Sequence, residues 1–281
     1  MTMQADHAGR LGRSSRSLWS DEKGYTVGLF NIAEVRDWAR EAGNVARHYF
    51  NNVTRTRKAD HSWVTQADLE IEHLLRERIA ARYPEHGMMG EEGGIGAIDR
   101  EFVWSIDPID GTGAFVSGLP LWSVSIGLLQ AGTPYLGVVY IPLLDDYYWA
   151  DAEGPAYRND QVIMVQNAEV IDRSDWIGIP SHSHRSYRIT FPGKARVLNS
   201  IAVDCCYVAR GAAVGAVLGR GSLWDVAGGM AVLRAAGGIM ATLSGDPIDM
   251  YGMLRGQKSH DTLIIGSPNM IERLRGCITR V

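Results

Sequence analysis

The sequence is poor in cysteine and has no long apolar run. Its 281 residues include three cysteines, Cys205, Cys206 and Cys277, which form neither a disulfide framework nor a paired Cys-x-x-Cys zinc arrangement. We therefore expect a reducing, cytoplasmic location. No apolar run approaches the ~18 to 20 residues that cross a bilayer. The N-terminus lacks the apolar stretch of a secretory signal, so residues 1–24 are expected to form a flexible tail.

An excess of basic residues is also absent. The chain has 28 Lys and Arg against 32 Asp and Glu, which gives a formal net charge of −4. This mild acidity argues against a nucleic-acid or membrane-surface partner, because both attract a basic face. Hydrophobic residues make up 46% and charged residues 21% of the chain, a composition typical of soluble globular proteins and too apolar for disorder.

Apolar residues at helical spacing predict four helices. Two lie in the first half of the chain, over 32–50 and from about 65 to 83, and two in the second half, over 201–208 and 224–236. Pro84 stops the second of these helices. The side chains predicted to point inward on that helix are Leu69, Leu74, Leu75 and Ile79.

Short apolar runs separated by turn residues predict strands. In the first half these runs lie at 102–106, 122–129, 135–141 and 146–150. The turns between them are short, which favours antiparallel pairing. In the second half, short strands at 239–243 and 262–265 alternate with the predicted helices. We therefore expect layered helices and sheets in two sub-domains that share one interface.

The most informative segment reads Trp-Ser-Ile-Asp-Pro-Ile-Asp-Gly-Thr over residues 104–112. A predicted strand delivers Asp107 at its end, and Asp110 follows three residues later. Two carboxylates so close repel one another unless a cation sits between them. Such oxygen-rich sites suit Mg²⁺, which accepts one or two carboxylates together with water and substrate phosphate. Taken alone, the two aspartates could also be ordinary turn residues.

Two further acidic segments could complete such a site. Glu91 lies in a Gly-Glu-Glu-Gly-Gly loop, and Asp225 follows Trp224 in the first turn of a predicted helix. Each has a structural alternative. An acidic residue in a glycine-rich loop is often only solvated, and an aspartate at a helix start accepts hydrogen bonds from free backbone amides.

Taken together, these segments resemble the inositol monophosphatase family. Gly-Glu-Glu, Asp-Pro-Ile-Asp-Gly-Thr and Trp-Asp-Val-Ala-Gly carry the resemblance, and Val-Thr-Gln-Ala-Asp over 64–68 supports it. The superfamily also holds fructose bisphosphatases and phosphonucleotide phosphatases. The resemblance, from about residue 32 to 274, implies an α/β fold of the layered αβαβα sandwich type and a homodimer. It implies one domain, 25–281, with a metal-binding sub-domain, 25–160, and a substrate sub-domain, 161–281.

The same resemblance implies a Mg²⁺ site with two or three ions. Glu91, Asp107 and the carbonyl of Ile109 would hold one ion. Asp107 would also bridge to a second ion bound by Asp110 and Asp225. A third, weaker ion would lie near Glu91. The implied activity is hydrolysis of a small phosphorylated metabolite by a metal-activated water.

Catalytic and substrate-binding roles follow from the resemblance as well. Thr112 and Asp68 would orient and deprotonate the attacking water, with Glu91 as the third predicted catalytic residue. Thr65 and Asp68 also fit a capping box, a purely structural alternative. The amides of Gly111 and Thr112 would hold phosphate oxygens. The predicted substrate-binding residues are Gly111, Thr112, Ser200, Arg220 and Asp225.

Two alternative classes of protein are disfavoured by single residues of the sequence. A haloacid-dehalogenase-type phosphatase needs a nucleophilic aspartate two residues before Asp110, and Pro108 occupies that position. A non-catalytic member of the family would usually have lost one of the acidic residues, and none is lost here.

The substrate is not fixed. Inositol-specific members usually carry a glutamate where this chain has Leu218, and Arg220 nearby could receive a second anionic group or be a solvated surface residue. We rank inositol monophosphate first, with histidinol phosphate and a sugar or nucleotide bisphosphate as alternatives.

Overall fold

Two β-sheets form the framework of the structure, a computed structural model that describes residues 19–20, 26–27, 30–52, 54–58, 63–167 and 170–281. The strands of the larger sheet are β5 (Gly87–Gly90), β6 (Gly94–Ile95), β7 (Phe102–Asp110), β8 (Ser123–Gln130), β9 (Thr133–Ile141), β10 (Asp146–Ala150), β11 (Ala156–Arg158) and β12 (Gln161–Ile163). Their order across the sheet is β12-β11-β10-β9-β8-β7-β5-β6. All neighbouring pairs are antiparallel except β5 and β7, which run parallel.

The smaller sheet follows the larger one in sequence. Its strands are β13 (Trp176–Gly178), β15 (Lys194–Arg196), β16 (Gly215–Gly219), β17 (Ile239–Thr242) and β18 (Leu263–Gly266), in the order β15-β13-β16-β18-β17. Three two-stranded ribbons complete the strands: β1 (Trp19–Ser20) with β2 (Thr26–Val27), β3 (Arg55–Arg57) with β4 (Trp63–Thr65), and β14 (Tyr187–Ile189) with β19 (Ile278–Arg280). The rest of the predicted tail, 1–24, lies outside the described residues.

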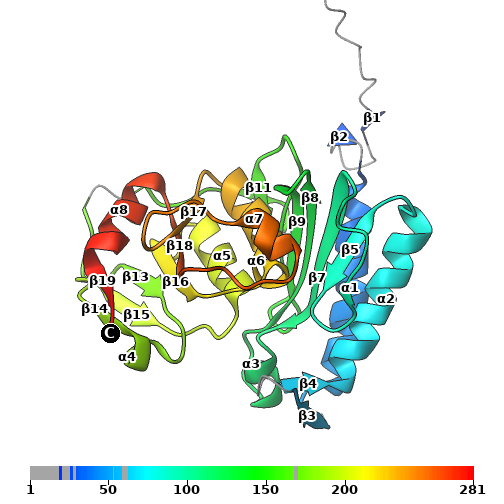
Figure 1. Cartoon of the computed structure of the whole chain (residues 1–281), viewed down its shortest axis with the longest axis horizontal. Helices are drawn as coiled ribbons and strands as arrows, with labels where there is room; N and C mark the ends of the chain where they lie inside the picture. The colour runs from blue at the N-terminus through cyan, green and yellow to red at the C-terminus, as the bar shows by residue number, and fades with distance from the viewer. Residues whose placement is uncertain (1–18, 21–25, 28–29, 53, 59–62, 168–169) are drawn as a thin grey trace, which may run out of the picture.

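Helices cover and separate the sheets. They are α1 (Ile32–Tyr49), α2 (Gln66–Arg82), α3 (Thr112–Val116), α4 (Ser183–Ser186), α5 (Ile201–Ala209), α6 (Leu223–Ala235), α7 (Met250–Leu254) and α8 (Pro268–Cys277). Figure 1 shows α1 and α2 on the outer face of the larger sheet and α5 and α6 between the two sheets. The α8 helix packs on the smaller sheet. These layers form the αβαβα sandwich that the resemblance implies. Within the described ranges, no helix is both long and apolar enough to cross a membrane.

The four predicted helices are confirmed, with one error in the side chains assigned to the core. On α2, the buried apolar residues are Ala67, Ile71, Leu75 and Ile79, which recur every four residues and form one stripe against the larger sheet. Leu69 is 49% exposed, so the prediction that it points inward was wrong. It lies two positions from Ile71, about 200° around the helix, and therefore faces solvent.

The predicted strands are also confirmed, and the antiparallel pairing of the first-half strands with them. Several elements were not predicted, among them β5, β13, β16 and α8. The three strands were missed because runs of three to five residues carry little periodic signal. The two adjacent cysteines on α5 are fully buried and belong to the apolar core between the sheets.

Small residues bring α6 unusually close to the larger sheet. A Cβ on Gly228 of α6 would lie 2.6 Å from the Ser125 hydroxyl oxygen on β8, and a Cβ on Gly137 of β9 would lie 2.9 Å from the Cβ of Ala231. Only glycine allows this approach. The contact brings the first turn of α6, which carries Asp225, toward the end of β7.

Candidate active site

A bulge at the end of β7 places two carboxylates on one face of the sheet. Asp107 pairs with Ser125 and Asp110 with Ser123, so three steps along β7 match two steps along β8. Without the extra residue, a three-residue spacing would put the two side chains on opposite faces. Because Ser125 faces α6, both aspartates point toward the helices between the sheets.

Asp107 is a buried carboxylate among other acidic groups. It is 1% exposed, and its Oδ1 atom has no hydrogen-bond partner in the part of the chain that the structure describes. Burial raises the pKa of Asp107 well above its usual value, and the negative charges of Glu91, Asp110 and Asp225 raise it further. A buried, unpaired acceptor is costly, so this atom points to a cationic partner.

Asp110 is held by the first turn of α5. Its carboxylate accepts hydrogen bonds from the Ser200 hydroxyl and from the backbone amide of Ala202 at 2.6 Å. Burial raises its pKa to about 6, although these bonds favour the ionised form. Ser200 also caps α5 by accepting from the Val203 amide at 3.1 Å. Ser200 is 3% exposed, and its hydroxyl contacts Asp110, the Val203 amide and the Ser123 hydroxyl.

Gly111 turns the chain from β7 into α3. Its φ of +94° lies in the left-handed region, and a Cβ there would come within 2.9 Å of the Asn199 carbonyl oxygen. Only glycine therefore fits between β7 and the start of α5. The next residue, Thr112, donates its hydroxyl to the Ile109 carbonyl at 3.0 Å. Two predicted site residues, Thr112 and Ile109, are thus in direct contact.

Asp225 caps α6 and also lies within electrostatic range of Asp110. Its Oδ2 accepts the Ser222 amide at 2.7 Å in a capping box. Burial raises the pKa of Asp225 to about 8, and the negative charge of Asp110 contributes to the same shift. Asp225 therefore does cap the helix, as the structural alternative proposed, and it also lies near Asp110.

Asp68 likewise combines a cap with an unpaired atom. Its Oδ2 accepts from the Thr65 amide at 2.8 Å and the Thr65 hydroxyl at 2.6 Å, which completes the capping box at the start of α2. Its Oδ1 is buried and has no partner among the residues described. Burial raises the pKa of Asp68 to about 6, although the Thr65 bonds favour ionisation.

Glu91 lies in the loop between β5 and β6, beside a lysine that the sequence analysis did not single out. The Lys58 ammonium donates to Glu91 at 2.8 Å and to Glu92. Although burial lowers it, these bonds raise the pKa of Lys58 above its ordinary value. Burial raises the pKa of Glu92 to about 7. Only the fold brings Lys58 to this loop, 33 residues away in sequence, so no local pattern would have revealed it.

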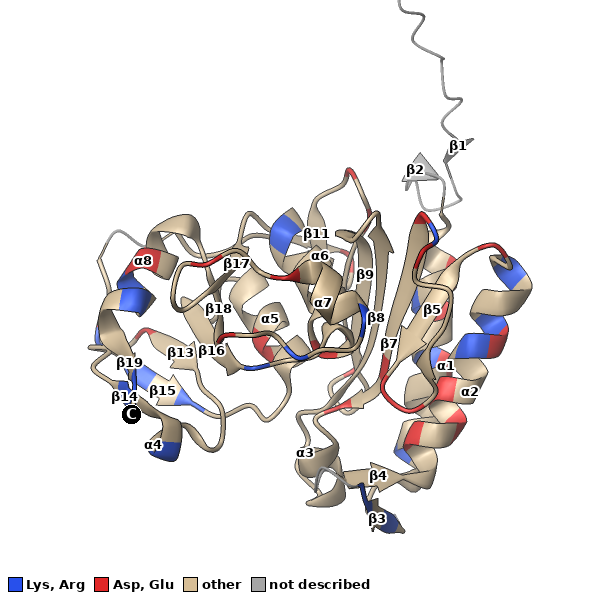
Figure 2. Ribbon diagram, in the orientation of Figure 1, with Lys and Arg blue, Asp and Glu red and all other residues tan. Residues whose placement is uncertain are grey.

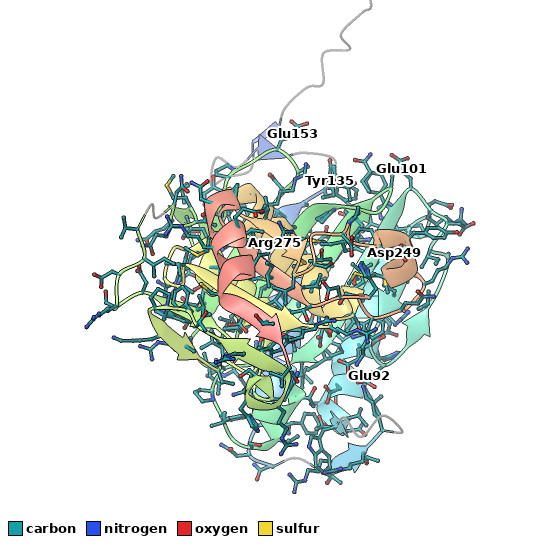
Figure 3. The ribbon with its side chains drawn as sticks, turned by 60° about the vertical axis from the view of Figure 1, so that its left-hand side comes forward. Glu92, Glu101, Tyr135, Glu153, Asp249 and Arg275 are labelled. Atoms are coloured by element: carbon teal, nitrogen blue, oxygen red, sulfur yellow. The ribbon has the colours of Figure 1, made fainter. Side chains whose placement is uncertain are left out.

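Acidic segments from four elements therefore gather around one place. Figure 2 shows red ribbon after β5, at the end of β7 and at the start of α6, toward the middle of the molecule. Glu92, labelled in Figure 3, lies on the same side of the molecule as Asp249, the residue before α7. A Cβ on Gly256 would lie 2.5 Å from the Ile95 side chain, so the loop after α7 touches the β5–β6 hairpin.

The chemistry of these groups fits Mg²⁺, although they are not arranged as a finished metal cage. Within the described residues, no group of three or more His, Cys, Asp or Glu side chains is positioned to hold a metal ion. The carboxylates instead bind Lys58, hydroxyls and backbone amides. Their oxygens are nonetheless the donors that Mg²⁺ prefers, and the unpaired Oδ1 atoms of Asp107 and Asp68 remain available.

Arg220, another predicted site residue, makes no hydrogen bond or ion pair with the site carboxylates in the part of the chain that the structure describes. It is exposed, in the connection from β16 to α6, and its Nε donates to the Ser259 carbonyl at 2.8 Å. The neighbouring Leu218 is 5% exposed and belongs to the apolar core. The side chain of Leu218 therefore offers no polar group to a substrate hydroxyl.

The chain is similar to known proteins over most of its length. The model of the inositol monophosphatase family matches residues 31–271. A fructose-1,6-bisphosphatase/inositol-1-monophosphatase of Aquifex aeolicus is 32% identical over 240 residues, 80% of this chain and 90% of the relative. A probable inositol 1-monophosphatase ImpA of Mycobacterium tuberculosis is 35% identical over 208 residues, 68% and 75% of the two chains. The solved extragenic suppressor protein suhB of Bartonella henselae matches with a TM-score of 0.75 at 25% identity, covering 87% and 96%.

Proposed function

Because the chain belongs to the inositol monophosphatase family, we propose that it hydrolyses a small phosphomonoester with the help of two or three Mg²⁺ ions. The family assignment makes it a phosphatase, since the named relatives are hydrolases of phosphomonoesters. The Mg²⁺ proposal depends mainly on Asp107. This carboxylate is buried near four other acidic groups, and its Oδ1 has no hydrogen-bond partner within the described residues. A divalent cation would relieve this repulsion.

The residues that would hold Mg²⁺ come from β7, α6 and the loop between β5 and β6. Asp107, Glu91 and the Ile109 carbonyl would hold one ion, and Asp110 and Asp225 would share a second with Asp107. When bound, Mg²⁺ supplies positive charge to the phosphate oxygens and acidifies the attacking water. The bulge in β7 supports this sharing, because it turns both aspartates toward Asp225.

The remaining chemistry is proposed to fall to Thr112 and Asp68. A carboxyl with a pKa of about 6 is ionised in most molecules at neutral pH and can accept a proton from water. The Thr112 hydroxyl, fixed by the Ile109 carbonyl, would orient that water. The amides of Gly111 and Thr112 would receive phosphate oxygens, and Gly111 keeps this segment free of a side chain.

The first substrate proposed is an inositol monophosphate, and the names of the Aquifex and Mycobacterium relatives support it. A second candidate, a sugar bisphosphate such as fructose 1,6-bisphosphate, is favoured by two observations. Leu218 offers no partner to ring hydroxyls, and the Ser259 carbonyl holds Arg220 through Nε. The rest of the Arg220 guanidinium is thereby left for a second anionic group.

A substrate panel tests these alternatives. Phosphate release is measured with and without Mg²⁺ from inositol 1-phosphate, histidinol phosphate, fructose 1,6-bisphosphate and 3′-phosphoadenosine 5′-phosphate. Mg²⁺-dependent turnover of inositol 1-phosphate that Arg220→Met leaves unchanged supports the first candidate. Preferential turnover of a bisphosphate, with a KM that Arg220→Met raises, supports the second. No turnover of any compound by folded protein contradicts both.

We further infer that the chain acts as a homodimer in the cytoplasm. The free cysteines fit a reducing compartment, since Cys205 and Cys206 are buried as thiols in α5. The dimer rests on the family relationship alone. Light scattering of the purified chain tests it, and a monomeric mass at micromolar concentration would contradict it.

A further inference from the structure

A buried glutamate on α2 holds the loop that carries Glu91. Glu72 is 2% exposed and follows Asp68 by one helical turn. Its Oε2 accepts the backbone amide of Glu92 at 2.7 Å, and its Oε1 accepts the amide of Gly93 at 2.7 Å. These are the two residues directly after Glu91. The Glu72 carboxylate therefore binds the loop through its backbone and makes no contact with the Glu91 carboxylate, which accepts from Lys58.

Arg76 adds to these contacts, and we call the pair Glu72 and Arg76 the clamp. Arg76, one turn further along α2, donates through Nε to Glu72 at 2.8 Å and through Nη2 to the Gly94 carbonyl at 2.7 Å. Glu72 thus has three donors, and its buried charge is paired. Together, Glu72 and Arg76 bind backbone groups of three consecutive residues, Glu92, Gly93 and Gly94, the last of which begins β6.

The clamp also explains the glycines of the Gly-Glu-Glu-Gly-Gly segment. A Cβ on Gly90 would lie 2.6 Å from the Glu72 carboxyl carbon. A Cβ on Gly93 would lie 2.5 Å from Arg76 Nε and 2.6 Å from Glu72 Oε1. The glycines on both sides of the acidic pair therefore leave room for the two α2 side chains. The loop is shaped around the clamp.

One helix consequently fixes two parts of the site. Residues four apart share a helix face, so Asp68 and Glu72 point from α2 toward the same region. We propose that Glu72, supported by Arg76, is a positioning residue that sets the place of Glu91 relative to Asp107 and thereby the affinity for Mg²⁺. This inference rests on the proposed function, because Glu91 matters here as a metal-holding residue. Groups that orient ligands in this way commonly change metal affinity by about 10- to 100-fold.

Two variants separate positioning from general support of the fold. Glu72→Gln keeps the size of the side chain but turns an amide NH₂ toward backbone donors. Arg76→Met keeps the apolar stem and removes the donors to Glu72 and Gly94. Glu77→Gln, on the exposed side of the same helix, is the matched control. For each folded protein, Mg²⁺ binding is measured by titration calorimetry without substrate, together with amide hydrogen exchange at Glu92 and Gly93 and the Tm.

The proposal predicts that Glu72→Gln weakens Mg²⁺ binding about tenfold or more and speeds exchange at both amides. Arg76→Met should shift both readings in the same direction by less, and Glu77→Gln should change neither. A lower Tm with unchanged Mg²⁺ affinity would show that Glu72 only supports the fold, and would overturn the proposal. If Glu72→Gln does not fold, Arg76→Met decides in the same way. Wild-type protein that binds no Mg²⁺ would overturn the proposed function itself, whatever the amides show.

Discussion

Adding Mg²⁺ to the metal-free protein at pH 7 is expected to release about one proton or more per chain, because metal ligands must be deprotonated. Burial and the charge of Asp110 raise the pKa of Asp225 to about 8, so roughly nine-tenths of this carboxyl is protonated at pH 7. Burial and the charge of Glu91 also raise the pKa of Asp107, so any proton that this carboxyl carries at pH 7 adds to the release. Asp110, with a pKa of about 6, contributes only about a tenth of a proton.

Titration calorimetry in buffers of different ionisation enthalpy measures this release directly. The slope of the apparent binding enthalpy against the buffer ionisation enthalpy gives the number of protons. At about pH 9 the Asp225 share should nearly vanish, because most of this carboxyl is then ionised before Mg²⁺ binds. Binding at pH 7 with no dependence on the buffer would refute the reasoning, since it would mean that the buried carboxylates are already ionised.

Three further outcomes follow from the same contacts. The carboxyls of Asp68, Asp110 and Asp225 have pKa values raised above the ordinary value near 3.8, so the folded metal-free chain binds more protons than the unfolded chain. Their contribution to stability is therefore full below about pH 4, where both states are protonated, and is lost as the pH rises from there to about 8. The Tm in chelator should fall over this range and Mg²⁺ should remove the fall, whereas a rising Tm in chelator would contradict the assignment. Gly111→Ala should cost roughly 1 to 3 kcal/mol, because φ is strained for alanine and the new Cβ meets the Asn199 carbonyl; an unchanged unfolding free energy in urea would count against this turn. Ser200→Ala should destabilise the protein by about 1 kcal/mol through loss of the α5 cap and should weaken Mg²⁺ binding, and equal Mg²⁺ affinity in the variant would argue against its contact with Asp110.

Local patterns predicted the regular elements well where those elements are long. The spacing of apolar residues predicted α1 and α2 nearly to their ends, because each helix has a single buried stripe over four turns or more. The error at Leu69 arose because leucine is apolar wherever it stands, and only the angular position of Ile71 and Leu75 shows which side is inward. Short strands such as β13 were missed because tertiary packing, more than local sequence, decides their conformation.

The candidate site was predicted by residue but not by arrangement. The motifs named Asp107 and Asp110, yet nothing in the sequence reveals the bulge that turns both to one face. Lys58 and Glu72 were not predicted because their partners lie far along the chain and each residue resembles a surface charge in its local sequence. The choice between a cap and a catalytic role for Asp68 was framed too narrowly, since one oxygen makes the cap and the other stays unpaired.

The most direct test of the central claim compares Asp107→Asn with the wild type. Asparagine keeps the shape of the side chain and removes the charge that would bind both Mg²⁺ ions. Circular dichroism and Tm establish that the variant is folded, and Mg²⁺-dependent phosphate release is then measured with the best substrate of the panel. The account predicts native-like folding and no measurable turnover. A folded variant that retains more than about a tenth of the wild-type kcat would contradict the role given to Asp107.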